Sequence, residues 1–553
     1  MVDCARSLSD ELCFLPIAEA ARQIAARALS PVALTEAYLA RISAVDAQLN
    51  AYVTLTADLA LQQAKAAEAE LQRGLNRGPL HGIPFGLKDM VETAGILTTA
   101  HSRLLAHNYP AKDAAVVERL RDAGAVLLGK HASHEFAHGG PSFDLPWPPA
   151  RNPWNTAHYT NGSSSGSAAA VAGGLAAMAI GTDTGGSIRS PSFLCGTVGL
   201  KPTFGLVSRS GVIPFSMSCD HVGPITRSVE DCAIVLQAIA GHDPRDPGSA
   251  RRELPDLAAS LRAGIKGLRI GIVRHFWEED APANATLRMA VDAAIDVLRD
   301  LGAIVEDVRL RSLRHYYAVR IVLTESELFA RHQHSLQQNA GAYGEHFLSR
   351  ILAATLFTSA DYIAAQRERR SIIEDMQPVY ARYDALLTAG AGPAPRLDAH
   401  QSLGARDKWA SPGVGALFSV TGAPALALPC GFSDDGLPLG MQIAGRPFED
   451  ATLLRIGHAY EQATRWGDRK PALIAGAVQP AIHTDAEHAS PVDVTDDIRG
   501  IVDAMLRRAG LRLTDSQRDL LYQAAPYAMA MTQLLPRDRS WNDDQASVFR
   551  LEQ

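Results

Sequence analysis

Three observations predict an α/β fold for this 553-residue chain. Between residues 268 and 310, a buried strand (LRIGIV), an amphipathic helix and a second strand (AIVEDVRL) follow one another. Residues 112–130 repeat the pairing, with an amphipathic helix closed by Gly124 and the strand AVLLG. Residues 155–202 place Gly/Ser-rich turns on either side of small apolar side chains, which can pack closely as a helix or a buried strand. Alternating helices and strands are typical of layered α/β proteins.

The N-terminal part is predicted to be helical, apart from one short apolar segment. Residues 16–48 have helical spacing that Ser30-Pro31 divides into two helices, with Pro31 suited to a first turn. A third helix covers 57–73. The segment 80–93 (LHGIPFGLKDMVET) then contains Lys88. A Lys-Asp pair after glycine is commonly a solvated turn, but the apolar neighbours favour a buried strand. Burial would lower the pKa of Lys88 and let it act as a base near pH 7.

Two further patterns resemble known motifs without satisfying their requirements. GAVLLGKH at 124–131 lacks the hydroxyl that a phosphate-binding GxxxxGK[ST] loop places after its lysine, and its centre is predicted to be a strand. His134, Glu135 and His138 form a literal HExxH, with His131 just before it. That zinc motif needs a continuous helix, which Gly139-Gly140-Pro141 would stop. We therefore expect no nucleotide site and no metal.

The second half is predicted to select the substrate and to carry a separate tail. Residues 311–400 are mainly helical, and we expect substrate selection in or near 311–329, where Tyr316 and Tyr317 are interpreted as helix packing. Residues 416–466 predict strand, hairpin, strand and helix. We place a domain boundary at 475, a linker at 476–491 and a helical extension at 492–553. A capping box, Thr514-x-x-Gln517, begins its second helix. Its apolar faces are expected to pack on the main domain or on a second subunit.

Composition bounds the classes of partner. The net charge of −7, with 47% apolar and 20% charged residues, argues against a nucleic-acid or anionic-membrane surface. The six cysteines are scattered without a CxxC pair, which indicates a reducing compartment. No signal peptide is visible, and the apolar run 168–181 is too short to cross a bilayer. We expect a cytoplasmic protein that binds neither nucleic acid nor membrane.

The chemistry is predicted to lie in two loops within residues 155–202. The first offers Ser163, Ser164, Ser165 and Ser167; the second, TDTGGS at 182–187, places Ser187 behind two glycines. Consecutive glycines bare backbone N–H groups that can form an oxyanion hole, here from Thr184, Gly185, Gly186 and Ser187. Ser187 is therefore the candidate nucleophile. A flexible Gly/Ser linker is the alternative, against which the apolar run 168–180 argues.

The segments NGSSSGSAAAVAGG, GTDTGGSIRSP and CGTVGLKPT resemble the signature of the amidase signature family, whose members hydrolyse C–N bonds with a Ser-Ser-Lys triad. The resemblance covers about residues 15–472. It implies the amidase-signature fold, a mixed sheet covered by helices. It also implies an acylated Ser187, a bridging Ser163 at a cis peptide bond and a catalytic Lys88, with no cofactor. Asp183 and Arg189 are expected to pair and brace the loop. The residues expected to line the substrate are Phe136, Gly139, Gly140 and Ser164.

This loop departs from the family pattern at Asn161 and Ser165, which stand where glycines are usual. A positive φ at residue 165 would strain a serine. Asn161 and Ser165 therefore bear on the shape of the loop and not on the assignment of Ser163.

We expect a serine amidase that cleaves C–N bonds other than peptide bonds. Aliphatic or aryl amides, carbamates and small urea derivatives all fit this chemistry, and the chain could form a homodimer. A different possibility is the glutaminase subunit of a glutamine-dependent tRNA amidotransferase, which shares the signature and delivers ammonia to a partner. The extension faintly resembles a small helical subunit that wraps some family members, here fused into one chain.

Overall fold

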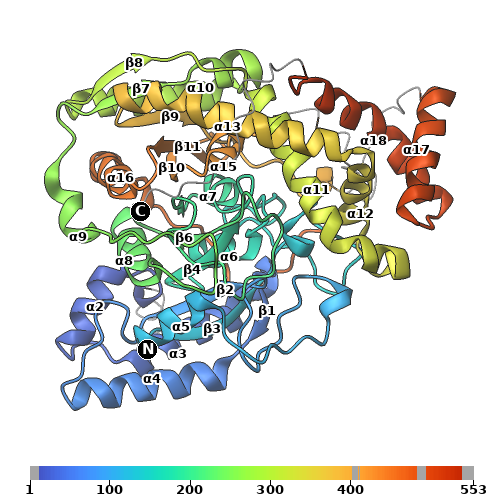
Figure 1. Cartoon of the computed structure of the whole chain (residues 1–553). Helices are drawn as coiled ribbons and strands as arrows, with labels where there is room; N and C mark the ends of the chain where they lie inside the picture. The colour runs from blue at the N-terminus through green and yellow to red at the C-terminus, as the bar shows by residue number, and fades with distance from the viewer. Residues whose placement is uncertain (1–10, 401–408, 410–411, 483–493, 538–553) are drawn as a thin grey trace.

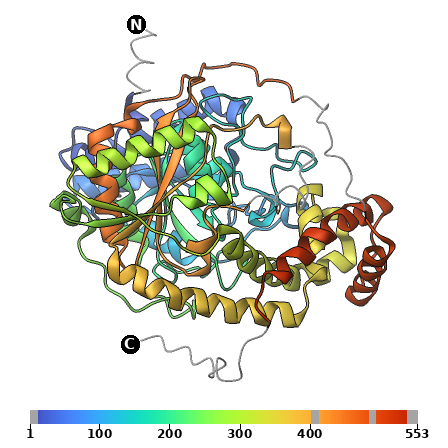
Figure 2. The same cartoon turned by 90° about the horizontal axis from the view of Figure 1, so that it is seen from above.

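A computed structural model describes residues 11–400, 409, 412–482 and 494–537. Across these residues eleven strands form one sheet, in the order β1-β3-β2-β4-β6-β5-β10-β11-β9-β7-β8. Helices surround the sheet in both views (Figures 1 and 2). The expected α/β class with a mixed sheet is therefore confirmed.

The N-terminal side of the sheet is built from four strands: β1 (Tyr52–Leu55), β2 (Pro84–Lys88), β3 (Val126–His131) and β4 (Met178–Asp183). β2 lies between β3 and β4 and is parallel to both, while β1 pairs antiparallel with β3. Every residue of β2, β3 and β4 is buried. The prediction of a buried strand around Lys88 is thus confirmed, with Lys88 as its last residue, and most of the GAVLLGKH segment forms β3.

The other half of the sheet mixes both pairings. β6 (His221–Thr226), β5 (Val198–Lys201), β10 (Ala425–Phe432), β11 (Pro438–Gly445) and β9 (Ala385–Ala389) are joined by antiparallel ladders. β7 (Arg269–Ile272) then pairs parallel with β9 and with β8 (Ile304–Asp307). β7, the helix after it and β8 form the strand-helix-strand unit expected from the sequence.

Helix α3 begins where the sequence predicts a first turn. Ser30 caps α3 with its hydroxyl, and Pro31 occupies the first turn.

The apolar run of the two-loop segment divides into one helix, α6, and the strand β4. The helices around the main sheet are α2 (Ile17–Ala25), α3 (Pro31–Leu49), α4 (Ala57–Gln72), α5 (Ala115–Asp122), α6 (Ser165–Ala172), α7 (Arg189–Cys195), α8 (Val229–Ile239), α9 (Leu257–Ser260), α10 (Ala285–Asp300), α11 (Leu313–Asn339), α12 (Glu345–Ile351), α13 (Ser359–Arg382), α15 (Ala416–Val420) and α16 (Asp450–Thr464).

Two C-terminal helices, α17 (Asp496–Ala509) and α18 (Asp515–Gln533), lie beside α11 and α12 at one side of the molecule (Figures 1 and 2). Leu521 and Ala525 of α18 are buried in the same apolar core as the main domain. Gln337 Nε2 of α11 donates to the carbonyl of Ala509 over 2.7 Å. The described part of the extension therefore packs on the main domain. Much of the expected linker lies outside the described residues, and the domain boundary at 475 stays a prediction.

No helix in the described ranges is both long and apolar enough to cross a membrane.

Candidate active site

The expected nucleophile stands in a tight turn at the end of a central strand. β4 ends at Asp183, the chain turns through 184–187, and α7 begins at Arg189. Gly185 and Ser187 are partly exposed, whereas their neighbours Thr184 and Ile188 are buried. Gly186 has a φ of +130°, a conformation that favours glycine. Gly185 and Ser187 are therefore the residues of this turn that solvent or a substrate can reach.

Lys88 lies behind this turn and contacts two hydroxyl groups. Its Nζ atom donates to Ser163 Oγ over 2.6 Å and to Thr182 Oγ1 over 2.7 Å. The peptide bond between Gly162 and Ser163 is cis, as the resemblance implied. Burial lowers the pKa of Lys88 to about 7, against the opposing attraction of Asp183 and Asp220. Sequence analysis missed Thr182 as a second partner, although its place at the end of β4 next to Asp183 was a usable signal.

Ser164 connects the loop that contains Ser163 to the loop that contains Ser187. Its backbone N–H donates to the carbonyl of Ser187 over 3.2 Å. Its hydroxyl donates to the carbonyl of Thr182 and accepts from the N–H of the same residue, over 3.2 and 3.3 Å. Ser164 is fully buried, so these contacts fit a bracing role better than the expected contact with substrate.

The unusual loop residues find conformations that suit them. Asn161 has a φ of +61°, and asparagine tolerates this left-handed region better than most residues. Ser165 is the first residue of α6 and has no positive φ. The strain considered for residue 165 is therefore absent, because the left-handed position is 161.

The donors available for an oxyanion differ from the expected set in one residue. The Gly186 N–H donates to Asp183 Oδ1 over 2.7 Å, so it is directed away from the open surface. The N–H groups of Thr184, Gly185 and Ser187 have no acceptor among the described residues. These three amides remain as candidate donors.

Asp183 and Arg189 form the expected pair, and Arg189 also contacts residues outside the turn, which was not predicted. Arg189 Nε and Nη2 each lie 3.0 Å from one oxygen of Asp183, and both side chains are buried. Burial acts to raise the pKa of Asp183, but the Arg189 guanidinium holds it well below its usual range. Arg189 also donates to Gln442 Oε1 of β11 and to Ser419 Oγ of α15, each over 3.0 Å. The pair thus fixes the turn to the distant half of the sheet.

A cavity of about 410 Å³ adjoins the turn on the side of Thr182 and Thr184. Thr184 Oγ1 donates to Asp220 Oδ1 over 2.6 Å, and burial raises the pKa of Asp220 to about 6. The wall combines apolar and charged side chains, including Ala137, Ile213, Phe215, Arg209 and Asp246. Such a mixture suits a small polar molecule with an apolar portion.

The segment expected to line the substrate packs mainly against helices. The Phe136 ring lies 4.5 Å from the His332 ring, and both belong to an aromatic cluster with Tyr343 and Phe347. A side chain at Gly139 or Gly140 would meet His346 of α12. In this segment it is Ala137 that reaches the cavity beside the turn. A substrate contact for Phe136, Gly139 and Gly140 remains a prediction.

The HExxH residues do not converge on one point. Phe136 and Ala137 both have positive φ, which breaks the helix that the motif requires. His134 contacts Tyr159, Glu135 accepts from Ser102, and His138 Nε2 lies 2.9 Å from Glu325. No group of three potential metal ligands is found within the described residues.

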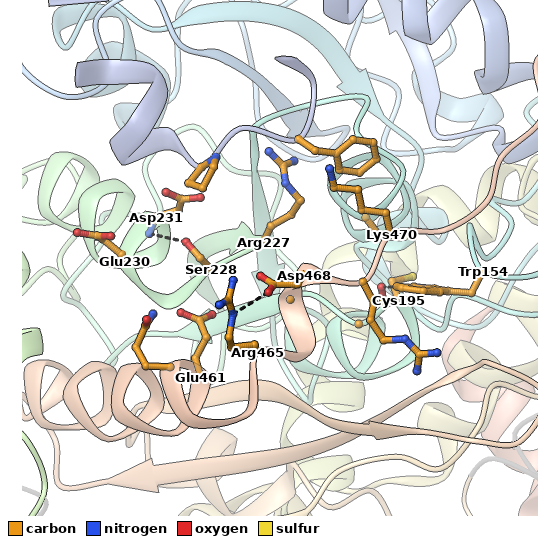
Figure 3. A pocket seen from close by; sticks show the side chains of 17 residues that line it. Trp154, Cys195, Arg227, Ser228, Glu230, Asp231, Glu461, Arg465, Asp468 and Lys470 are labelled. Atoms are coloured by element: carbon orange, nitrogen blue, oxygen red, sulfur yellow. Dashed lines mark hydrogen bonds and ion pairs between the residues drawn. The ribbon is translucent and has the colours of Figure 1, made fainter. Parts of the chain in front are cut away.

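A second cavity, of about 590 Å³, lies away from the turn (Figure 3). Charged side chains gather around it, among them Arg227, Asp231, Glu461, Arg465 and Lys470. Ser228 bonds with the Asp231 backbone and Arg465 pairs with Asp468 beside it. Lys88, Ser163 and Ser187 line neither this cavity nor the one beside the turn, but only the latter is lined by Thr182 and Thr184 of the loop that carries Ser187. The turn after β4 therefore stays the predicted place of the nucleophile.

Known proteins resemble the chain over most of its length. The Amidase family model matches residues 33–454. A glutamyl-tRNA(Gln) amidotransferase subunit of Chloroflexus aurantiacus is 41% identical over 488 residues, which are 84% of this chain and 99% of that protein. A solved chain from a vestigial protein complex, described in connection with the origins of an s-triazine catabolic enzyme, has a TM-score of 0.76 and 33% identity, covering 81% of this chain and 99% of its own. A bacterial aryl acylamidase of the amidase signature family has a TM-score of 0.74 and 28% identity, covering 82% and 98%.

These names correct the expectation about partners. We expected a small-molecule amide as the partner, no nucleic acid or membrane, and at most a second copy of the chain. The curated relatives are named as one subunit of an amidotransferase, and a subunit functions together with other chains. The expectation that named no protein partner other than a second copy is therefore wrong. The sequence analysis missed it because net charge and apolar content do not identify a protein interface. The family match, the shared fold and the length of the alignment establish that this chain belongs to the amidase family, as an amidase-signature hydrolase of C–N bonds.

Proposed function

We propose that this chain is the amide-hydrolysing subunit of an amidotransferase-type assembly, with glutamine as substrate and Ser187 as the acylated nucleophile. The observation that carries the proposal is the buried contact of 2.6 Å between Lys88 Nζ and Ser163 Oγ, next to Ser164, whose N–H donates to the carbonyl of Ser187. A lysine whose pKa is near 7 is neutral in a large fraction of molecules at physiological pH and can accept a proton.

Acylation begins when Ser187 Oγ attacks the carbonyl carbon of the amide. The Ser187 proton passes to Ser163, and the Ser163 proton passes to Lys88. The developing negative charge on the carbonyl oxygen is stabilised by the N–H groups of Thr184, Gly185 and Ser187, which have no other described acceptor. Asp183 and Arg189 hold the turn in place through their buried pair.

The C–N bond then breaks as the same path runs in reverse. Ser163 gives its proton to the leaving nitrogen and takes one from Lys88, so the nitrogen leaves as ammonia. Water next attacks the acyl group on Ser187 and loses its proton through Ser163 to Lys88. The acid product leaves when the proton returns to Ser187 Oγ, which restores the starting state.

The glutamine assignment is supported by the relatives. Those of Chloroflexus and Moorella are 41% and 39% identical over almost their whole lengths, and both are named for the same amidotransferase subunit. In such an assembly the ammonia would be passed to a partner chain, where it is consumed. The catalytic chemistry on Ser187 is the same whether the ammonia is passed on or released.

A second candidate function is hydrolysis of a small catabolic amide with release of ammonia to solvent, within a protein complex of a different kind. Two observations favour it. The chain from the vestigial complex has a TM-score of 0.76, and the alignment with the curated relatives leaves about a sixth of this chain unmatched, since it covers 84%. That unmatched part has no counterpart in the Chloroflexus relative, of which the alignment covers 99%.

The test measures ammonia and glutamate from purified full-length chain supplied with glutamine, without ATP, tRNA or any second protein. Ser187→Ala should abolish release, while the neighbouring Ser190→Ala should retain it. A slow wild-type rate that rises severalfold with proteins copurified from the native host supports the amidotransferase assignment. A fast rate on other small amides, with glutamine left intact, would favour the second candidate. Retained release by Ser187→Ala would overturn both.

A further inference from the structure

We propose that Arg320 binds a carboxylate of the substrate, so that this site is built for amides that carry a negatively charged group. Arg320 belongs to α11, within the 311–329 segment where the sequence predicts substrate selection, but no sequence pattern singled it out. The inference deepens the proposed function, on which it rests, by naming the chemical class of substrate and the residue that selects it.

Arg320 reaches the catalytic turn from a distant part of the chain. A Cβ atom added to Gly185 would lie 2.7 Å from Arg320 Nη1 and 3.0 Å from its Cζ atom. The guanidinium therefore sits directly on Gly185, whose N–H is one of the three candidate oxyanion donors. A substrate whose carbonyl oxygen faces Gly185 would place its neighbouring atoms within reach of this guanidinium.

The charge of Arg320 is buried and has no carboxylate in contact with it. Only 6% of the residue is exposed, and its Nε atom has no hydrogen-bond partner. Among residues 11–400, 409, 412–482 and 494–537, no hydrogen bond or ion pair engages the guanidinium. Buried arginines are normally paired because removing an unpaired charge from water is unfavourable. A carboxylate brought by the substrate would supply the missing partner, and guanidinium binds carboxylates with two parallel hydrogen bonds.

Nearby acidic groups are already engaged. Glu325, also on α11, feels the charge of Arg320 at a distance, but its carboxylate lies 2.9 Å from His138 Nε2 and 3.7 Å from Arg350 Nη2. Asp220 accepts from Thr184 Oγ1 and from the N–H groups of Phe215 and Ser216. Both carboxylates thus have other partners in contact, so the guanidinium can bind an incoming anion.

Two other roles for Arg320 make different predictions. Its Cζ atom lies 4.9 Å from the centre of the Tyr317 ring, so the side chain could serve packing alone. It could also stabilise the oxyanion through its charge. Either role would affect charged and neutral amides equally, whereas carboxylate binding affects only charged ones.

The experiment compares amides that differ only in the carboxylate. Malonamate, succinamate and glutaramate span three chain lengths, and their neutral counterparts are propionamide, butyramide and pentanamide. We expect wild type to prefer at least one charged amide over its neutral counterpart. Arg320→Gln should lower kcat/KM for that charged amide about 10- to 100-fold, the range typical of a hydrogen bond to a charged group. It should leave the neutral amide within about threefold.

Two further variants control for charge and folding. Arg320→Lys keeps the charge but not the paired geometry, so its loss on the charged amide should be intermediate. Arg314→Gln removes the same charge from an exposed position of α11 and should change neither substrate. Binding is measured separately by calorimetry in a Ser187→Ala background, where glutaramate or succinamate should bind and the Arg320→Gln double variant should bind it at least tenfold more weakly.

The outcomes separate the two proposals. If wild type hydrolyses charged and neutral amides equally well, or if Arg320→Gln loses the same factor on both, the carboxylate assignment is overturned while the hydrolase assignment stands. If wild type hydrolyses none of these amides, the release of ammonia from glutamine decides the proposed function, and the calorimetric comparison decides whether Arg320 binds a carboxylate. Equal binding by the Arg320→Gln background would overturn the inference by itself.

Discussion

At the scale of single residues, the protonation state of Lys88 controls the proposed chemistry. The side chain is fully buried at the end of β2, and burial lowers its pKa to about 7. Its neutral form can accept a proton from Ser163, and its charged form cannot. Because the pKa is lowered, the active neutral form gains population as pH rises through 7.

The pH dependence of kcat/KM follows from this. For a neutral amide, kcat/KM should fall about tenfold per pH unit well below pH 7 and level off above it. The Lys65→Met variant should retain this limb, because Lys65 is an exposed lysine of α4 and does not contact the triad. A profile that stays flat from pH 5 to 8 would show that Lys88 does not act as the base.

Lys88 and Ser163 should matter more for amides than for esters. An amide nitrogen needs a proton before it leaves, whereas a phenoxide leaves with little help. Lys88→Ala and Ser163→Ala should therefore slow a matched amide about 10²- to 10⁴-fold and the ester far less. Both are measured as kcat/KM with a shared acyl group, with the exposed Lys65→Met as the control. An equal loss on the two substrates would mean that Lys88 only shapes the site.

At the scale of elements, the turn between β4 and α7 depends on one buried ion pair. Removing Arg189 leaves the Asp183 carboxylate buried without its partner, which typically costs about 3–5 kcal/mol. Arg189→Met should therefore lower the melting temperature strongly and remove activity. The exposed pair Arg309–Glu279 offers a matched control, because Arg309→Met breaks the same kind of contact at the surface and should leave stability nearly unchanged.

The pH dependence of stability tests the same pair. The folded pKa of Asp183 lies below its unfolded value, so the pair stabilises the protein above the ordinary aspartate pKa near 4. That contribution is lost as pH falls towards the folded pKa. In urea unfolding, the difference between wild type and Asp183→Asn should shrink as pH is lowered from 6 to 3. A difference that is constant across this range would contradict the role of the ion pair.

The sequence predicted the elements that local patterns determine. Apolar neighbours identified β2 as buried around Lys88, and Pro31 and Thr514 marked the starts of α3 and α18, where both caps are found. The paired Asp183 and Arg189 were also expected, since they lie six residues apart in one signature.

Contacts between distant segments were not predictable in the same way. Arg320 meets Gly185 across more than a hundred residues, and no local pattern encodes that approach. The acceptor for the Gly186 N–H depends on the rotation of one peptide plane, which composition does not determine. The long helix α11 could be predicted as a helix, but the face it turns to the catalytic loop could not.

At the scale of the whole molecule, the C-terminal helices pack on the main domain. Leu521 and Leu520 are adjacent on α18, but Leu521 is 1% exposed and Leu520 is 38% exposed. Leu521→Ala should cost about 2–5 kcal/mol in the free energy of unfolding of the unit to which α18 belongs, and Leu520→Ala much less. Limited proteolysis and thermal unfolding should both separate the two variants. Equal behaviour would show that α18 is not held as described.

The same packing bears on the site, because α18 lies against α11 and α12. Loosening this layer should weaken substrate selection before it affects the chemistry on Ser187. For Leu521→Ala we therefore expect a raised KM for a charged amide with kcat little changed, measured below the temperature at which the variant unfolds. A lowered kcat with an unchanged KM would contradict this view.

The most direct test of the account is to locate the acyl group during turnover. Full-length protein is mixed with an activated ester that shares its acyl group with a cleaved amide, quenched in acid within milliseconds, digested and analysed by mass spectrometry. We predict an acyl adduct on the peptide that contains Ser187 in wild type and in Ser190→Ala, and no adduct in Ser187→Ala. An adduct on another residue, or an equal adduct in Ser187→Ala, would contradict the assignment of Ser187 as the nucleophile.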